Sequence, residues 1–100
     1  MRANFSGPLR LIGSIRGEGK LLWASSGSQS VTYAVDLYSQ GQMQTGNGEV
    51  CGGLSSLVGR SPTNLRLRLA DGVEVPVALT EIEPDRAMVE LLGPVTLPAT

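Results

Sequence analysis

Apolar and polar residues alternate along most of this chain, and a period of two predicts β-strands rather than helices. The longest regular run is Ser30–Gln40, with the sequence SVTYAVDLYSQ. One face of this run is apolar and consists of Val31, Tyr33, Val35 and Leu37. The other face is mixed and consists of Ser30, Thr32, Ala34, Asp36 and Tyr38. We expect the apolar face to lie in the core and the mixed face to meet water or a partner.

Glycines, prolines and short polar clusters divide the rest of the chain into further strands. Four of these strands are expected at residues 9–15, 20–25, 42–51 and 87–92. Turns or loops are expected at residues 17–19 (GEG), 25–29 and 61–64. Only GGLSSLVGR, residues 52–60, has helical spacing of its apolar residues, and it has room for one or two turns.

The strongest local signal is LRLRLADGVEVPVAL, residues 65–79, which contains two alternating runs around Asp71-Gly72. A two-residue loop would turn the apolar face of each run away from that of the other, because side chains alternate with period two. A three-residue loop over residues 70–72 corrects this register, with Gly72 in the left-handed conformation. The expected pairs are then Leu69 with Val73, Leu67 with Val75, Leu65 with Val77, and Arg68 with Glu74.

Together these elements predict an all-β domain of about six strands, with at most one short helix near residues 53–59. A small antiparallel β-barrel and a compact sandwich are the two architectures that fit. Pro76 cannot donate a backbone hydrogen bond, so we expect its strand to be a sheet edge or to carry a bulge there. One hundred residues form a single domain, 1–100, for which we expect frayed ends at 1–7 and 94–100.

The composition removes several kinds of chemistry. The chain has no histidine and one cysteine, Cys51. This excludes histidine-based catalysis, most zinc and haem sites and an internal disulfide. We therefore expect no enzyme activity, no metal and no cofactor, and we interpret Cys51 as a small buried hydrophobic residue.

The charge and hydropathy of the chain narrow the range of partners. A net charge of −1 gives no overall field for anionic lipid or nucleic acid, although nucleic acid is not excluded. No segment has the apolar length of a transmembrane helix or of a signal peptide, so we expect a cytoplasmic protein that does not bind membranes. Arg10, Arg16 and Lys20 are too few for a nucleic-acid site by themselves.

Asp36 is the only charged residue between Lys20 and Glu49. Catalysis by a carboxylate usually needs a second group with a separated pKa, and no residue nearby in the sequence supplies one. We interpret Asp36 as a surface carboxylate that pairs with Arg66 or Arg68.

The four aromatic residues are Phe5, Trp23, Tyr33 and Tyr38. We expect Trp23 and Tyr33 to anchor the core, since a core of this size depends on its largest apolar residues. If Trp23 and Tyr38 are instead exposed, they form a platform on which a base, a sugar or a peptide side chain stacks. The glycine-rich stretch 39–53 lacks the context of a phosphate-binding loop, and we expect it to be a bent hairpin.

DLYSQGQM, residues 36–43, resembles the Asp/Asn-x-Ser-x-x-Gly stretch of PilZ domains, which are six-stranded barrels that bind cyclic di-GMP. The spacing here is D-x-x-S-x-G, through Asp36, Ser39 and Gly41. The Arg-x-x-x-Arg that precedes this stretch in the family is absent. No ligand-binding residue is therefore assigned from this resemblance.

Two hypotheses follow for the function. The first is a non-catalytic protein-interaction or accessory module that uses a sheet edge, with self-association through that edge as a special case. The alternative is a β-barrel that binds a small anionic ligand, a nucleotide or single-stranded nucleic acid through exposed aromatic residues and arginines. The candidate binding residues are Trp23, Asp36, Tyr38, Arg66 and Arg68.

Overall fold

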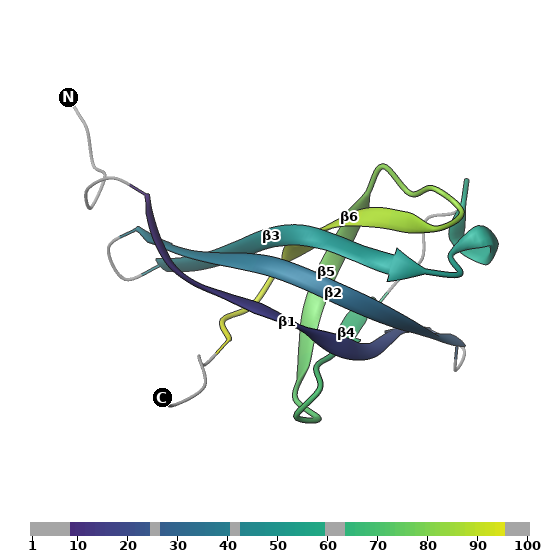
Figure 1. The fold of residues 1–100 in the computed structure, drawn as a ribbon, viewed down its shortest axis with the longest axis horizontal. Helices are drawn as coiled ribbons and strands as arrows, with labels where there is room; N and C mark the ends of the chain where they lie inside the picture. The colour runs from purple at the N-terminus through teal and green to yellow at the C-terminus, as the bar shows by residue number, and fades with distance from the viewer. Residues whose placement is uncertain (1–8, 25–26, 41–42, 60–63, 96–100) are drawn as a thin grey trace.

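A computed structural model describes residues 9–24, 27–40, 43–59 and 64–95, which form a closed antiparallel barrel (Figure 1). Its strands are β1 (Arg10–Trp23), β2 (Gly27–Gln40), β3 (Met43–Gly52), β4 (Arg66–Arg68), β5 (Glu74–Thr80) and β6 (Arg86–Leu91). Their order around the barrel is β1-β2-β3-β6-β5-β4. The predicted all-β fold is confirmed, and the barrel is the correct choice of the two architectures.

The apolar face predicted for β2 lines the barrel interior. Val31, Tyr33, Val35 and Leu37 are all buried, whereas Thr32 on the opposite face is exposed. These side chains meet a core of buried aliphatic residues from every other strand, among them Leu21, Val50, Leu67, Val75 and Val89. Each such residue contributes about 1.5–3 kcal/mol when it is fully buried, so this face is the main source of stability for β2.

Glycines on the strands beside β2 make room for its large side chains. Leu37 lies between Gly13 of β1 and Gly46 of β3 in the sheet register. A Cβ atom on Gly48 would lie 2.0 Å from the backbone oxygen of Ala34. Gly46, Gly48 and Gly52 of the predicted bent hairpin therefore belong to a regular strand, where they let neighbouring backbones and side chains pack closely.

The turn predicted at residues 17–19 is wrong, because these residues lie inside β1 and pair with β2. A Cβ on Gly17 would lie 2.9 Å from the hydroxyl oxygen of Tyr33, and one on Gly19 would lie 2.0 Å from the backbone oxygen of Arg68. These glycines thus serve close packing rather than chain reversal. The two strands predicted at 9–15 and 20–25 are consequently one strand of 14 residues.

The hairpin of β4 and β5 has the predicted register. Leu67 pairs with Val75 and Arg68 with Glu74. The Leu69 N–H donates a hydrogen bond of 2.8 Å to the Val73 carbonyl, which closes the three-residue loop. Gly72 has a φ of 93°, the left-handed conformation expected for the last residue of this loop.

β5 as a whole is not an edge strand, because it has a neighbour on both sides, and its pairing shows no bulge. The expected edge is confined to Pro76 itself, which pairs with Arg66 of β4 but lies outside the pairing of β5 with β6. The regular pairing of β5 with β6 begins at the next residue, where Val77 faces Leu91. The Pro76 carbonyl accepts a hydrogen bond of 2.8 Å from the Leu92 N–H beyond the end of β6. Proline is tolerated at this position because it lies outside the regular β5–β6 pairing, in which a backbone N–H would be needed.

The predicted short helix is a single 3₁₀ turn, Ser55–Leu57, at one end of the barrel. Leu54 and Leu57 are buried, and the Leu54 N–H donates a hydrogen bond of 2.8 Å to the Pro84 carbonyl. This turn closes that end of the core.

The chain ends were expected to fray at 1–7 and 94–100, but Val95 is buried. Residues 1–7 and 96–100 lie outside the described residues, as does most of the predicted loop 61–64. None of the helical segments described could cross a membrane.

Gly48→Ala should destabilise the barrel by about 1–3 kcal/mol, because the backbone oxygen that the new methyl group meets can move only with its strand. Gly53→Ala is the matched control, since the nearest atom, on Gln29, is 3.7 Å from its Cβ. The control should stay within about 0.5 kcal/mol of the wild type. Urea unfolding followed by Trp23 fluorescence measures both, and equal midpoints for the two variants would contradict this packing.

Candidate functional site

Among the residues that the structure describes, the first half of β1 has a partner strand on only one side. β1 pairs with β2 from Arg10 to Trp23, but it pairs with β4 only from Lys20 to Leu22. Gly17 and Gly19 lie close to Ala70 and Arg68, so the unpaired part within the described structure runs over residues 10–16. We call this segment the open edge. It lies where β1, β2 and β3 extend beyond β4, β5 and β6 (Figure 1).

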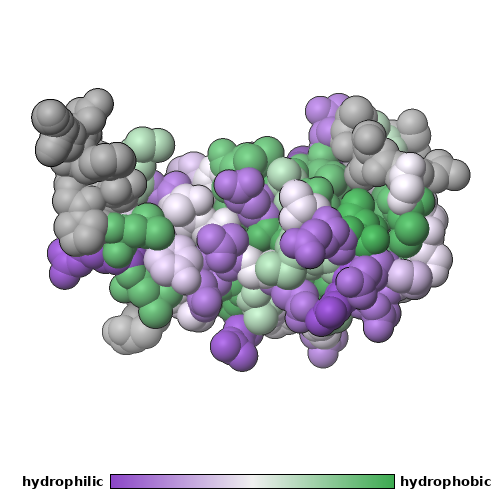
Figure 2. Space-filling model, turned by 90° about the horizontal axis from the view of Figure 1, so that it is seen from above, coloured by the Kyte–Doolittle hydropathy of each residue, from purple (hydrophilic) through white to green (hydrophobic). Residues whose placement is uncertain are grey.

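The open edge carries apolar side chains in contact with solvent. Leu11 is 61% exposed and Ile12 is 38% exposed, and both lie at a β-bulge between Leu11 and Gly13. Leu9 and Met43 are exposed near the same end of the sheet. Figure 2 shows apolar surface at this end of the molecule, on the left of the view. The described part of the chain contains no ion pair to Arg10 or Arg16, so this end is both apolar and positively charged.

Asp36 holds the open edge to β2. The Ser14 hydroxyl donates a hydrogen bond of 2.8 Å to Asp36 Oδ1 across the sheet. The expected ion pair of Asp36 with Arg66 or Arg68 is wrong, because both arginines bind Glu74 instead. The arginines lie on β4, which pairs with β1 and β5 and not with β2, the strand of Asp36. Which strands are neighbours could not be read from the sequence.

Trp23 and Tyr38 lie near opposite ends of β2. Trp23 pairs with Gly27, whereas Tyr38 pairs with Leu11. Gly27 and Tyr38 are roughly 36 Å apart along the strand, at about 3.3 Å per residue. Both rings are half-buried, and Trp23 packs against the core as expected. The idea of a joint stacking platform is therefore wrong.

Three of the five candidate residues do come together. Trp23, Arg66 and Arg68 line a shallow depression of about 430 Å³ over the seam between β1 and β4. Lys20, which was grouped with Arg10 and Arg16 on sequence alone, also lines it. The pairing of β1 with β4 sets Lys20 opposite Arg68, and this contact between distant segments could not be read from sequence spacing.

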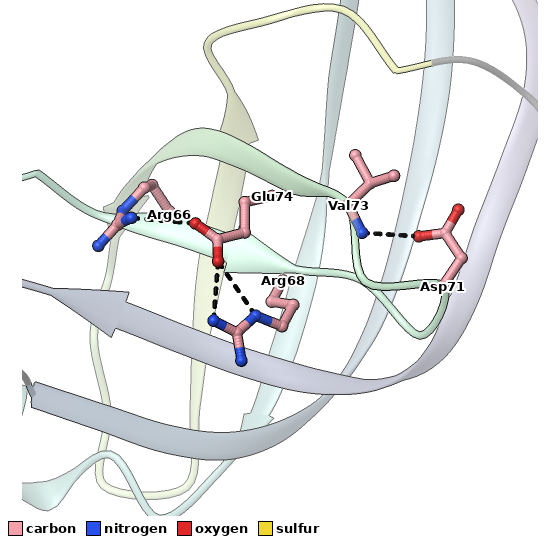
Figure 3. Close-up of polar contacts among 5 residues, drawn as sticks. All are labelled: Arg66, Arg68, Asp71, Val73 and Glu74. Carbon is pink, nitrogen blue, oxygen red and sulfur yellow. Dashed lines mark hydrogen bonds and ion pairs between the residues drawn. The ribbon is translucent and has the colours of Figure 1, made fainter.

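Glu74 lies between the two arginines of β4 (Figure 3). Its Oε2 accepts hydrogen bonds from Arg68 Nε at 3.1 Å and from Arg68 Nη2 at 2.8 Å. Its Oε1 accepts one from Arg66 Nη1 at 3.0 Å. The hydrogen bonds from Arg68, followed by the charges of Arg68 and Arg66, hold the pKa of Glu74 below its ordinary value. In the adjoining loop, Asp71 accepts a hydrogen bond of 3.0 Å from the Val73 N–H.

A second depression, of about 490 Å³, is lined by residues that include Glu18, Lys20, Thr32 and Cys51. Burial raises the pKa of the Cys51 thiol, and the charge of Glu49 raises it further. A raised pKa disfavours the thiolate, which is the reactive form of cysteine. Among the residues that the structure describes, no cluster of three or more carboxylate or thiol side chains is placed to hold a metal.

Comparison with known proteins gives no further guide to these surfaces. No protein-family model, no curated protein and no solved structure matches the chain. The functional interpretation therefore depends on the open edge and on the depression beside Trp23.

The ion pairs of Glu74 should make stability depend on pH. Because its folded-state pKa is lowered, they stabilise the fold fully above the pKa that Glu74 has when unfolded. This stabilisation is lost as the pH falls through the folded-state pKa. At neutral pH the urea midpoint of the wild type should therefore be higher than that of Glu74→Gln. The difference between the two midpoints should shrink as the pH is lowered. NMR titration should also show a higher Glu74 pKa in Arg68→Gln; an unchanged pKa would contradict the assignment.

Proposed function

We propose that this protein is a non-catalytic interaction module that binds an extended segment of a partner protein along the open edge. The observation that carries the proposal is the side of residues 10–16 that no other described residue pairs with, beside exposed Leu11 and Ile12. An unpaired strand edge presents backbone donors and acceptors that a peptide strand can bind, and the side chains beside it supply specificity. Seven residues give an edge of roughly 23 Å, enough for a typical strand.

The outer face of the open edge indicates the sequence of the bound segment. Leu11, Ser14 and Arg16 share this face, since they pair with Tyr38, Asp36 and Ala34 of β2. On a partner strand added beside β1, the Cβ atom of a residue directly opposite Leu11 or Arg16 would lie about 4.5–5.5 Å from the Cβ atom of that residue. We infer a partner segment with an apolar residue opposite Leu11 and an acidic residue opposite Arg16.

A second copy of this chain is a weaker candidate for the occupant. Pairing two open edges would bring both copies of Arg10 and Arg16 to one seam. Like charges in neighbouring strands are destabilising, whereas an acidic segment would neutralise them. The bulge beside Ile12 also twists this edge, which disfavours extended self-pairing.

The absence of catalysis is part of the same proposal. The chain lacks histidine, the thiol of Cys51 has a raised pKa, and Asp36 accepts a hydrogen bond from Ser14. These features support a binding role over acid–base or nucleophilic chemistry. A cytoplasmic location, proposed from the lone thiol and the sequence pattern, fits such a module.

Selection of peptides from a random 12-residue library on the immobilised protein should enrich segments that alternate apolar and acidic residues. The enriched peptide should perturb the amide NMR signals of residues 10–16 before those of β5 and β6. Arg16→Glu should weaken its binding at least about fivefold, because the change replaces an attractive cross-strand pair with a repulsive one.

Arg16→Lys is the matched control, since it keeps the charge and should bind within about twofold of the wild type. Leu11→Ala should also weaken binding while leaving the fold intact, because Leu11 is exposed. Light scattering should show a monomer. Perturbations centred on another surface, or a dimer that depends on residues 10–16, would contradict the proposal.

A further inference from the structure

We propose that the depression beside Trp23 is a binding site for a small phosphate-bearing molecule. It is lined by Lys20, Arg66 and Arg68, which come from β1 and β4. This site is distinct from the open edge and adds a second activity to the proposed interaction module. Its volume of about 430 Å³ lies within the range of small-ligand pockets.

The arrangement of charge at this seam costs stability. Lys20 lies directly opposite Arg68, and Arg66 is two residues away on the same face of β4. Like charges directly opposite in neighbouring strands are destabilising. Glu74 pairs with Arg66 and Arg68, and it is the one carboxylate that the described structure pairs with any of these three cations, so the group keeps a charge of +2. A bound dianion would neutralise it.

The polar side chains of the depression match a phosphate group. Besides the Trp23 indole, five of them can donate hydrogen bonds, and no acidic side chain is among the described residues that line it. These donors are Lys20, Ser28, Asn64, Arg66 and Arg68. Arginine and lysine are the usual donors to phosphate oxygens, because each hydrogen bond is strengthened by charge.

Glu74 competes with the proposed ligand for the two guanidinium groups. It accepts hydrogen bonds from both arginines, but each arginine side chain keeps close to half of its surface exposed. Lys20 is exposed and has no ion pair within the described residues. Removing the Glu74 charge should therefore strengthen anion binding, and removing the Lys20 charge should weaken it.

Trp23 makes the site directly measurable. It is the only tryptophan of the chain and it lines the depression. Its ring covers Gly27, where an added Cβ would overlap the indole. A ligand held by Lys20 and Arg66 would change the surroundings of this indole, so intrinsic fluorescence reports occupancy.

The test is a fluorescence titration of the full chain with inorganic phosphate, pyrophosphate and ATP at low and physiological salt. Pyrophosphate should bind more tightly than phosphate, because more oxygens reach the three cations. ATP binding tighter than pyrophosphate would assign the ligand as a nucleotide, while equal binding would assign it as a phosphate group alone. Both outcomes support the proposal.

Variants separate a site from a general charge effect. Lys20→Gln should weaken pyrophosphate binding about fivefold or more, yet raise the urea midpoint by relieving its repulsion with Arg68. Glu74→Gln should strengthen binding by a similar factor. Glu83→Gln is the matched control, since it removes the same charge from the ion pair with Arg86 elsewhere on the barrel.

Three results would overturn the proposal. The first is equal strengthening by Glu74→Gln and Glu83→Gln, which would show a general effect of net charge. The second is no saturable change with any of the three anions. The third is a single-stranded oligonucleotide that binds more tightly than ATP, which would identify a nucleic-acid surface instead. The peptide selection on the open edge is unaffected by each of these results.

Discussion

The barrel is closed by three residue pairs between β1 and β4, and the rest of the architecture depends on that seam. At its centre, Leu21 and Leu67 pair with each other and are both completely buried. The buried Tyr33 reinforces the seam, because its hydroxyl accepts a hydrogen bond of 3.0 Å from the Ala70 N–H beside β4. Without these contacts β1 would have no partner on its second side, and the core would open to water.

The sequence pattern predicted the local features well because each depends on neighbouring residues. The alternation on β2 identified the inward side chains, and matching the faces of the two runs at 65–79 identified the register of Leu67 with Val75. The turn predicted at 17–19 failed, since glycine has the same sequence signature in a turn and in a tightly packed strand. Only the position of Arg68 on a distant strand distinguishes these two roles for Gly19.

The candidate site was predictable in part for the same reason. Trp23, Arg66 and Arg68 were identified by residue type, and the fold brings them together. Asp36 and Tyr38 were assigned to the same surface because strand alternation places them on an outer face, but alternation does not fix position along a strand. The open edge was not predicted at residues 10–16, since which strand lacks a partner is a property of the closed topology. Pro76 suggested that β5 is an edge strand. In the structure only the pairing of β5 with β6 leaves out Pro76, because it begins one residue later, at Val77.

The glycines that flank β2 also determine where this protein can meet other molecules. A barrel of eight strands has an interior just wide enough to be filled by side chains, and a barrel of six strands is narrower still. Glycine at Gly17 and Gly46 leaves that limited volume to the side chains of Tyr33 and Leu37 on β2. Every side chain in the described core is hydrophobic, and Leu54 and Leu57 close one end. The interior is therefore filled with side chains, and ligands and partners can bind only to the outer surface of the barrel and to the open edge.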